Sequence, residues 1–411
     1  MQDILFIGHR IPFPPDRGDK IRSHHILQAL ARIAPVHVAT FADDDADMAE
    51  EAELAFMARS YRLVHRSKPL LLAGLQALKA GRSVSRTAFF DTALAEYVAR
   101  TLRDQRIDVI YVFSGQMGQY IPKGYKGRVI IDFVDVDSAK FEAYAAKGNP
   151  VMRWVHRREA RVLGREEQKL ARRADTSLLI SAAEAQLFLA RLDASSRQKA
   201  NVHVLGNGID SAFFNPVLVE AEPRLAALPG PKLIFTGQMD YGPNVDGVVR
   251  MAQRILPKIR AQIPSASFHI VGRNPHSDVE ELAALPGCHV WGRVDDIRSW
   301  LKAADMAVVP LEIARGVQNK VLEAMAMMLP VVLTSGAATG IGALDGTHFA
   351  IADSDDDLAA AAVQLLSDSY TMRRIGAEAR YYVRDQQSWK AALAGLPALV
   401  RGQRGGATRA G

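Results

Sequence analysis

The chain has 411 residues, of which 48% are hydrophobic and 23% charged, so it can form two globular domains with substantial cores and does not resemble a disordered chain. Its net charge is +6, but the basic residues are not interleaved with aromatic ones, which argues against nucleic-acid binding. The one cysteine, Cys288, excludes an internal disulfide and suits a reducing cytosol, and no segment reaches the ~20 apolar residues of a membrane-spanning helix.

Short apolar runs alternate with helical patterns along the chain. The opening segment MQDILFIGHR is expected to form a strand, because it lacks the charged region and long apolar run of a signal peptide. Apolar runs separated by helices predict parallel sheets covered on both faces, and two such series predict an α/β fold with two doubly wound domains. The expected strands are residues 4–8, 36–41, 108–113, 128–134 and 176–181, then 232–237, 267–272, 288–292, 306–310 and 330–334.

The domain boundary is expected in residues 215–232, which are rich in proline and small residues. This places a first domain at 1–215 and a second at 216–383. A further helix is expected at 384–402, followed by a disordered basic tail at 403–411.

Two loops of the first domain follow strands at the sheet edge where α/β proteins bind ligands. In the first loop, Gly18 allows the backbone to approach a ligand, and Asp19 begins a helix, where an aspartate ordinarily acts as a cap. In the second loop, Asp135 is a candidate to accept a proton from a substrate hydroxyl. The alternative is a solvent-exposed turn capped by Ser138. Asp132, Asp135 and Asp137 alternate with apolar residues there, but no His or Glu accompanies them at metal-ligand spacing, so no metal site is expected.

Three strands of the second domain end in glycine, at Gly237, Gly272 and Gly292. Each glycine alone is ordinary turn chemistry. Three of them at one sheet edge suggest a flat ligand lying against backbone.

The segment RGVQNKVLEAMA, residues 315–326, places a lysine and one acid around a helix start. Lys320 and Glu323 share a helix face, and one interpretation is an intrahelical ion pair contributing only ~0.2–0.5 kcal/mol. The other interpretation is a phosphate site on the N–H groups of Val317, Gln318 and Asn319, aided by Lys320, with Glu323 accepting hydrogen bonds from ribose hydroxyls.

Together these motifs resemble the retaining glycosyltransferases of family 4. The resemblance rests on NVHVLGNGIDSAFFNP (201–216), KLIFTGQMDYGPNVDGV (232–248) and GVQNKVLEAMAMMLPVV (316–332). With PPDRGDKIR and IIDFVDVDSAKF, the chain is more narrowly similar to sugar transferases of PEP-CTERM exopolysaccharide systems. The resemblance implies a GT-B fold, in which two Rossmann-like domains face a cleft and the last helix rejoins the first domain. It also implies a nucleotide-sugar donor, retention of configuration and no metal or other cofactor.

Residue by residue, the resemblance assigns ribose binding to Glu323, the phosphate cradle to Gly316–Asn319 and a phosphate-covering loop to Gly18. It places Arg293 and Val294 beside the base. The chain departs from the family pattern at four positions, where a glutamate is replaced by Arg315, an arginine by Gln238, a glycine by Asp19 and a histidine by Asp135. Lys320 and Arg315 are expected to hold the leaving diphosphate, and Asp135 to orient the acceptor hydroxyl.

The expected function is transfer of a sugar to a lipid-linked or other saccharide acceptor at the inner face of the cytoplasmic membrane. Basic helices at 68–86 and 153–173 would then contact anionic lipid, although a solvated helix face explains them equally well. Two alternatives are a nucleotide-sugar epimerase of GT-B fold and a non-catalytic nucleotide-sugar-binding protein.

Overall fold

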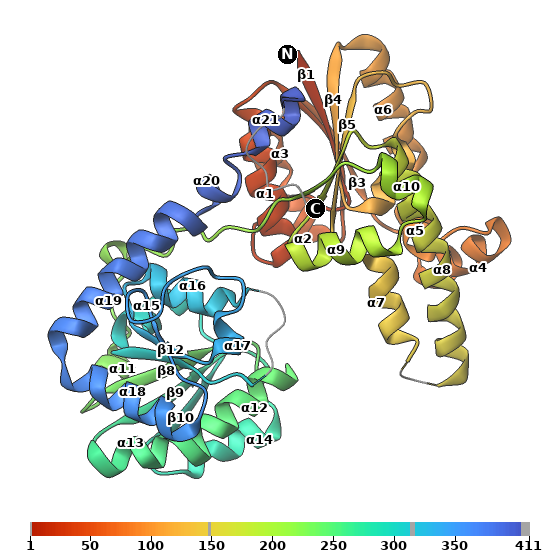
Figure 1. The fold of residues 1–411 in the computed structure, drawn as a ribbon. Coiled ribbons are helices and arrows are strands. Elements are labelled where there is room, and N and C mark those ends of the chain that lie inside the picture. Colours follow the sequence, from red (N-terminus) through yellow and green to blue (C-terminus); the bar gives the residue numbers. More distant parts are fainter. Residues whose placement is uncertain (1, 147–148, 313–316, 404–411) are drawn as a thin grey trace. The chain divides into compact units, whose positions relative to one another are not determined.

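The computed structural model describes residues 2–146, 149–312 and 317–403 of the chain. The chain forms two compact units, one of Met1–Asn207 with Ala392–Gly411 and one of Gly208–Ala391 (Figure 1). Each unit has its own parallel sheet and its own hydrophobic core.

The sheet of the first unit has seven parallel strands in the order β3-β2-β1-β4-β5-β6-β7. The interior strand β1 carries the apolar run Ile4–Ile7, which is fully buried, as expected for a strand covered on both faces. Figure 1 shows α1 and α3 on one face of this sheet and α6 on the other. The strands are β1 (Asp3–Gly8), β2 (Val36–Ala42), β3 (Ser60–His65), β4 (Ile107–Phe113), β5 (Arg128–Val134), β6 (Thr176–Leu179) and β7 (Val202–Val204). The helices are α1 (Gly18–Ala31), α2 (Asp45–Ala49), α3 (Glu51–Met57), α4 (Leu70–Ala80), α5 (Val84–Ala88), α6 (Thr92–Asp104), η1 (Gly115–Tyr120), α7 (Asp137–Tyr144), α8 (Pro150–Arg173), α9 (Ala182–Arg191), α10 (Ala194–Lys199) and α21 (Leu396–Arg401).

The sheet of the second unit has six parallel strands in the order β10-β9-β8-β11-β12-β13. In each sheet the strand order reverses beside the first strand, between β1 and β4 and between β8 and β11, and ligands of open α/β sheets bind at such points. The strands are β8 (Lys232–Thr236), β9 (Ser267–Val271), β10 (Cys288–Gly292), β11 (Met306–Val309), β12 (Val331–Leu333) and β13 (Ala350–Ile351). The helices are η2 (Pro216–Leu218), α11 (Pro223–Ala226), α12 (Gly242–Arg250), η3 (Met251–Ile255), α13 (Leu256–Gln262), α14 (Ser277–Glu280), η4 (Glu281–Ala284), α15 (Ile297–Ala303), α16 (Asn319–Ala326), α17 (Ser335–Ala338), α18 (Asp355–Ser367), α19 (Ser369–Tyr382) and η5 (Val383–Gln387), with α20 (Trp389–Ala392) at the boundary of the units.

The units divide at residues 207/208 and 391/392, whereas the sequence placed the boundaries at 215/216 and 383/384. The reason is local pairing, because the Ile209 N–H donates to the Gln387 carbonyl at 2.7 Å and Ile209 bridges Ser388. These contacts hold both crossing segments to the second unit.

The single helix expected at 384–402 is instead broken into η5, α20 and α21. Ser388 is extended, and its hydroxyl caps the following turn at Ala391 N, so the helix restarts there. The α21 segment packs on the first unit, where Arg128 Nε donates to the Leu399 carbonyl at 2.8 Å. Residues 404–411 of the expected basic tail lie outside the described residues.

Candidate functional site

The three strand-end glycines of the second unit interlock through their backbones. Gly237 N donates to the Val271 carbonyl at 3.1 Å, and Gly272 N donates to the Gly292 carbonyl at 2.8 Å. A Cβ added at Gly272 would lie 1.7 Å from the Gly237 oxygen, so only glycine fits at this position. The result is a ledge of bare backbone at the carboxyl edge of the sheet.

Above this ledge lies a pocket of about 600 Å³. Its wall includes ten residues that the sequence assigned to ligand binding or catalysis. The lining residues are Thr236, Gly237, Gln238, Tyr241, Asn244, Val271, Gly272, Arg273, Arg293, Val294, Ile297, Val317, Gln318, Asn319, Lys320 and Glu323. Arg315 and Gly316, which the sequence placed in the same loop, lie outside the described residues.

The side chain of Lys320 is fixed from two directions. Its ammonium group donates a hydrogen bond to Asn244 Oδ1 and lies 4.4 Å from the centre of the Phe235 ring. Asn244 is buried, and its Nδ2 donates to the Gln238 carbonyl at 2.8 Å, which sets the orientation of its amide. Burial lowers the pKa of Lys320 to about 8, against the opposing influence of the Glu323 charge.

Glu323 is half-buried one turn further along α16. Among the described residues, no side chain or backbone group donates a hydrogen bond to its carboxylate, and Lys320 is not within ion-pair distance. Burial raises the pKa of Glu323 to about 7, with Lys320 opposing the shift. Leaving a partly buried acceptor unsatisfied costs free energy that a ligand with hydroxyl donors recovers.

The start of α16 adds donors to the pocket. Gln318 occupies the N-cap position but its side chain makes no capping hydrogen bond. The N–H groups of Asn319 and Lys320 have no acceptor within the described parts of the chain. Exposed N–H groups at a helix start attract anions such as phosphate.

Six of the lining residues were not assigned from the sequence, and two of these, Asn244 and Arg273, make side-chain hydrogen bonds that shape the pocket. Asn244, which holds Lys320, lies in α12, and nothing in the sequence pairs it with a lysine in α16. Arg273 Nη2 donates to Gln238 Oε1 at 3.4 Å, and its guanidinium is exposed at the pocket. Its position directly after a strand-end glycine, like that of Gln238, was a usable signal.

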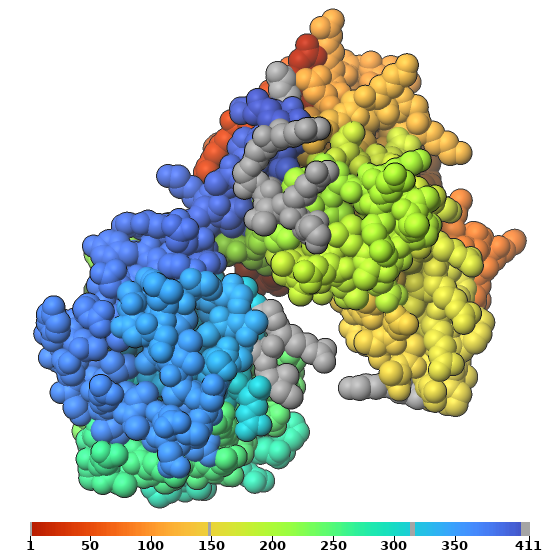
Figure 2. Space-filling view, viewed as in Figure 1, coloured from red at the N-terminus to blue at the C-terminus, as the bar shows by residue number. Residues whose placement is uncertain are grey.

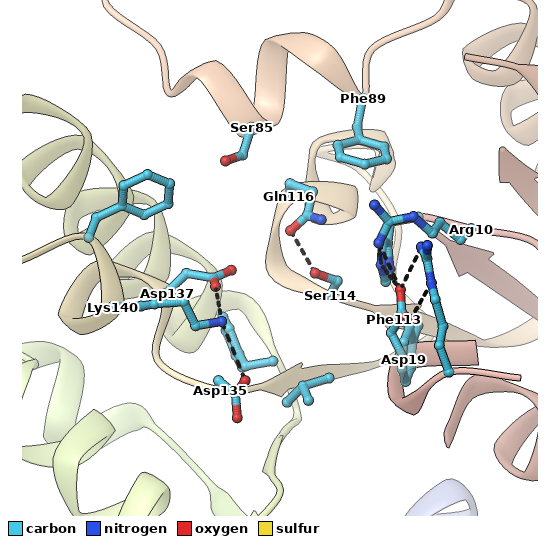
Figure 3. Close-up of a pocket in the computed structure, with 15 residues that line it drawn as sticks. Arg10, Asp19, Ser85, Phe89, Phe113, Ser114, Gln116, Asp135, Asp137 and Lys140 are labelled. Carbon is cyan, nitrogen blue, oxygen red and sulfur yellow. Dashed lines mark hydrogen bonds and ion pairs between the residues drawn. The ribbon is translucent and has the colours of Figure 1, made fainter. Parts of the chain in front are cut away.

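The first unit has a second pocket, of about 550 Å³, at the carboxyl ends of β1, β4 and β5 (Figure 3). Asp19 and Asp135 both lie in its wall. Gly18 begins α1 without lining this pocket, and a Cβ added there would meet nothing within 4 Å. The lining residues are His9, Arg10, Arg17, Asp19, Ser85, Phe89, Phe113, Ser114, Gln116, Phe133, Val134, Asp135, Asp137, Lys140 and Phe141.

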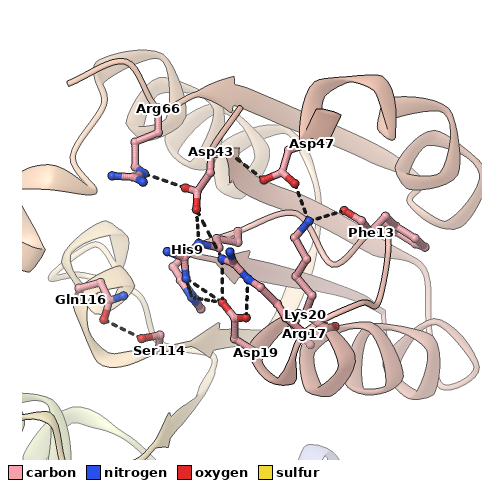
Figure 4. A network of polar contacts seen from close by, with 12 residues as sticks. His9, Phe13, Arg17, Asp19, Lys20, Asp43, Asp47, Arg66, Ser114 and Gln116 are labelled. Carbon is pink, nitrogen blue, oxygen red and sulfur yellow. Dashed lines mark hydrogen bonds and ion pairs between the residues drawn. The ribbon is translucent and has the colours of Figure 1, made fainter. Parts of the chain in front are cut away.

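The carboxylate of Asp19 is held by three basic side chains (Figure 4). It accepts hydrogen bonds from Arg10 Nη1 at 2.7 Å and Arg17 Nε at 2.9 Å, and His9 Nε2 lies 3.2 Å away. Burial alone would raise the pKa of Asp19, but these hydrogen bonds hold it well below its usual range. Asp19 therefore orders the loop that carries Arg10 and Arg17.

Asp135 is more open than Asp19. Lys140 Nζ lies 3.4 Å from Asp135 Oδ2 and 3.3 Å from Asp137 Oδ1 (Figure 3). Two neighbouring residues of this pocket, Ser114 and Val134, have left-handed backbones with φ of 78° and 68°. Such strain in non-glycine residues, above all in a β-branched valine, is concentrated at functional sites.

Across the described ranges, no group of three or more His, Cys, Asp or Glu side chains is arranged to hold a metal ion.

Comparisons with known proteins identify a matching family model and solved structures of similar fold. Residues 230–368 match the sequence model of the family described as glycosyl transferases group 1. No curated protein sequence matches the chain. The fold is similar to sucrose-phosphate synthase from Thermosynechococcus elongatus, with a TM-score of 0.59, 17% identity and coverage of 98% of this chain and 99% of that one.

Two other solved structures are similar along their whole length. HepE from Anabaena, determined with UDP and glucose, has a TM-score of 0.59 and 16% identity, and covers 97% of this chain and 99% of its own. WaaG, a glycosyltransferase involved in lipopolysaccharide biosynthesis, has a TM-score of 0.58 and 16% identity, and covers 98% of this chain and 100% of its own. The two parallel α/β sheets form a GT-B fold, as the sequence predicted, and the pocket of the second unit lies within the matched family domain.

Proposed function

We propose that this chain, a glycosyltransferase of GT-B fold, moves a sugar from a nucleotide-diphosphate sugar to a saccharide acceptor with retention of anomeric configuration. One observation carries the choice of donor. Within the described part of the chain, Glu323 presents a carboxylate without a hydrogen-bond donor, beside Lys320 and the N–H groups of Asn319 and Lys320, which have no acceptor there. A ribose diol and a diphosphate supply the groups that this pair of sites lacks.

The donor class has independent support. HepE, which shares this fold, binds UDP-glucose, UDP and glucose in its solved structures. In the proposal, the base lies beside Arg293 and Val294, the ribose contacts Glu323, and the diphosphate rests on the N–H groups of Asn319 and Lys320. Arg315 and Gly316 complete the phosphate loop in this proposal.

The reaction breaks the bond between the anomeric carbon and the diphosphate oxygen, and negative charge grows on the departing diphosphate. Donors already fixed in place stabilise that charge most effectively, and Lys320 is such a donor because Asn244 and Phe235 hold it. The acceptor hydroxyl attacks the same face of the sugar, and its proton passes to the departing phosphate oxygen. The products are a nucleoside diphosphate and a glycosylated acceptor. No metal takes part in this scheme.

The acceptor is proposed to bind in the pocket of the first unit, where Asp135 orients the attacking hydroxyl. The open carboxylate and the strained backbone at Ser114 and Val134 support a functional role for this pocket. We further propose a lipid-linked saccharide of exopolysaccharide biosynthesis as the acceptor, reached from the cytoplasmic face of the membrane. The participation of WaaG in lipopolysaccharide biosynthesis supports an acceptor of this class.

The test is a thermal-shift screen over nucleotide sugars followed by a diphosphate-release assay with membrane lipid extract. We expect one donor to raise the melting temperature. We also expect the nucleoside diphosphate to be released only when extract is present. Conversion of the donor without acceptor would instead indicate an epimerase. Binding without release would indicate a non-catalytic protein, and NMR of the product reports the anomeric configuration.

A further inference from the structure

Helix α4 exposes its large apolar side chains, although a helix that packs only on its own unit would bury them. The residues of α4 that are buried are two alanines, Ala73 and Ala77. Its five leucines face outward and are between 47% and 86% exposed; this leucine face consists of Leu70, Leu71, Leu72, Leu75 and Leu78. A surface helix ordinarily buries its large apolar side chains, so the leucine face requires a partner outside the unit.

The leucine face does not stand alone, because α4 lies against α8. Arg158 of α8 donates hydrogen bonds to the carbonyls of Ala77 and Arg82, each at 3.0 Å. The first turns of α8 expose further apolar side chains, with Val151 71% and Trp154 57% exposed. Figure 2 shows α4 (orange) and this end of α8 (yellow) at the periphery of the first unit.

The same region is cationic. Residues 54–90 contain no Asp or Glu and seven Lys or Arg. Five exposed cations on α4, on α8 and just after α4 have no ion-pair partner within the described residues. These are Lys79, Arg82, Arg153, Arg157 and Arg161.

Two of these cations also line a cavity. Arg157 and Arg161 form part of a pocket of about 430 Å³ between α7, α8 and α9. A third arginine in its wall, Arg191, is neutralised by Glu142 at 2.6 Å. The remaining two guanidinium groups suit a phosphate, which they bind with forked hydrogen bonds.

We propose that the leucine face, together with the exposed cations of α4 and α8, docks the protein on an anionic lipid bilayer. Exposed leucines beside an exposed tryptophan and unpaired arginines match the layers of a bilayer surface, where acyl chains, interface and phosphates follow one another. Helix α4 has 11 residues and therefore lies in the interface without crossing it. No other helix within the described ranges is both long and apolar enough to span a membrane. A protein partner would need an apolar surface surrounded by acidic side chains. An anionic bilayer combines acyl chains with negatively charged headgroups and therefore fits both the leucines and the cations.

The test is flotation of the full chain with phosphatidylcholine vesicles, with and without phosphatidylglycerol. Binding is expected only with phosphatidylglycerol at low salt, and it should be lost at about 1 M salt, where the Debye length is about 3 Å. Leu71→Gln combined with Leu75→Gln should lower the vesicle-bound fraction roughly tenfold or more, since both leucines insert. Leu344→Gln, at a similarly exposed leucine of the second unit, is the matched control and should bind like wild type.

The cationic part has its own pair of variants. Arg157→Glu with Arg161→Glu should also lower binding roughly tenfold or more, since each reversal replaces attraction to the anionic surface by repulsion. Lys199→Glu with Lys390→Glu makes the same charge change at exposed sites elsewhere and should retain binding. No flotation of wild type, or a dimer that separates into monomers when Leu71 and Leu75 are replaced, would overturn the proposal. The assay contains neither donor nor acceptor, so its outcome is independent of the proposed reaction.

Discussion

Lys320 and Glu323 lie three residues apart on α16 without forming an ion pair. The ammonium group of Lys320 is turned to Asn244, 76 residues away in the sequence, and the carboxylate of Glu323 remains open to the pocket. This geometry excludes the simpler interpretation of the segment as an intrahelical pair that stabilises the helix. Burial disfavours the charged form of both groups in the empty pocket. Ionisable groups held in this way are typical of sites that bind a ligand.

If Lys320 stabilises the leaving diphosphate, Lys320→Ala should lower kcat by about 10²–10³, which corresponds to roughly 2.7–4 kcal/mol of barrier. Nucleotide affinity should fall far less, because the N–H groups at the start of α16 remain. Steady-state kinetics and calorimetric titration of the nucleoside diphosphate measure the two effects. Lys258→Ala, at an exposed lysine paired with Asp356, is the control. Equal losses in kcat and affinity would contradict the assignment.

Glu323→Gln should stabilise the empty protein while weakening donor binding. Because the pKa of Glu323 is raised from 4.5 to about 7, the native state retains a proton that the unfolded state loses between these values. Wild-type stability therefore falls as pH rises through this window, and the full penalty is present above pH 7. At pH 8 the variant should be more stable by roughly 1–2 kcal/mol in urea denaturation, and the difference should vanish near pH 4. A destabilised variant at pH 8 would show that Glu323 has a structural partner.

Much of the fold was predictable because central strands carry continuous apolar runs. All ten predicted strands are present, and those missed were β3, β7 and β13, which lie at sheet edges. Strand β3 has Arg62 and His65 facing solvent, so its pattern lacks the apolar continuity on which the prediction depended.

The pocket was predictable where it follows from chain order. Glycines that end neighbouring parallel strands must meet at one edge, and the position of α16 follows from the strand before it. The partner of Lys320 was not predictable, because side-chain contacts between α12 and α16 depend on how both helices pack on the sheet. The bounds of the two compact units differ from the expected domain boundaries for a similar reason, since the pairing of Ile209 with Ser388 joins two distant segments.

Gly272→Ala should destabilise the second unit, since the added Cβ would lie 1.7 Å from the Gly237 oxygen. The two strand ends would have to separate, and a loss of roughly 2–4 kcal/mol in unfolding free energy is expected. Gly242→Ala is the matched control, because a Cβ there meets nothing within 4 Å and alanine favours the helix that begins at this residue. Similar stabilities of the two variants in urea denaturation would argue against the interlocked glycines.

Asp135→Asn should lower kcat by about 10²-fold with little change in donor affinity, because the neutral amide oxygen accepts a weaker hydrogen bond from the acceptor hydroxyl than the carboxylate does and so orients it less firmly. Asp137→Asn loses the same contact with Lys140 and lies in the same pocket, so it controls for effects on that lysine. The measurement is transfer rate at saturating donor with varied acceptor. Equal rates for the two variants would assign both acids to loop structure.

Arg273 offers a positive charge where the chain lacks one at Gln238, whose carboxamide it contacts at 3.4 Å. If Arg273 binds donor phosphate, Arg273→Ala should weaken nucleoside diphosphate binding by roughly tenfold, or about 1.4 kcal/mol. Adding Gln238→Arg should then restore most of the affinity, because an arginine after Gly237 approaches the same pocket from the neighbouring strand. Calorimetry on the two variants separates this from a structural role, since a variant damaged in its fold would not regain affinity through a second substitution. Unchanged binding in Arg273→Ala would show that Arg273 does not bind phosphate. Among the residues described, Lys320 and the N–H groups at the start of α16 would then hold it.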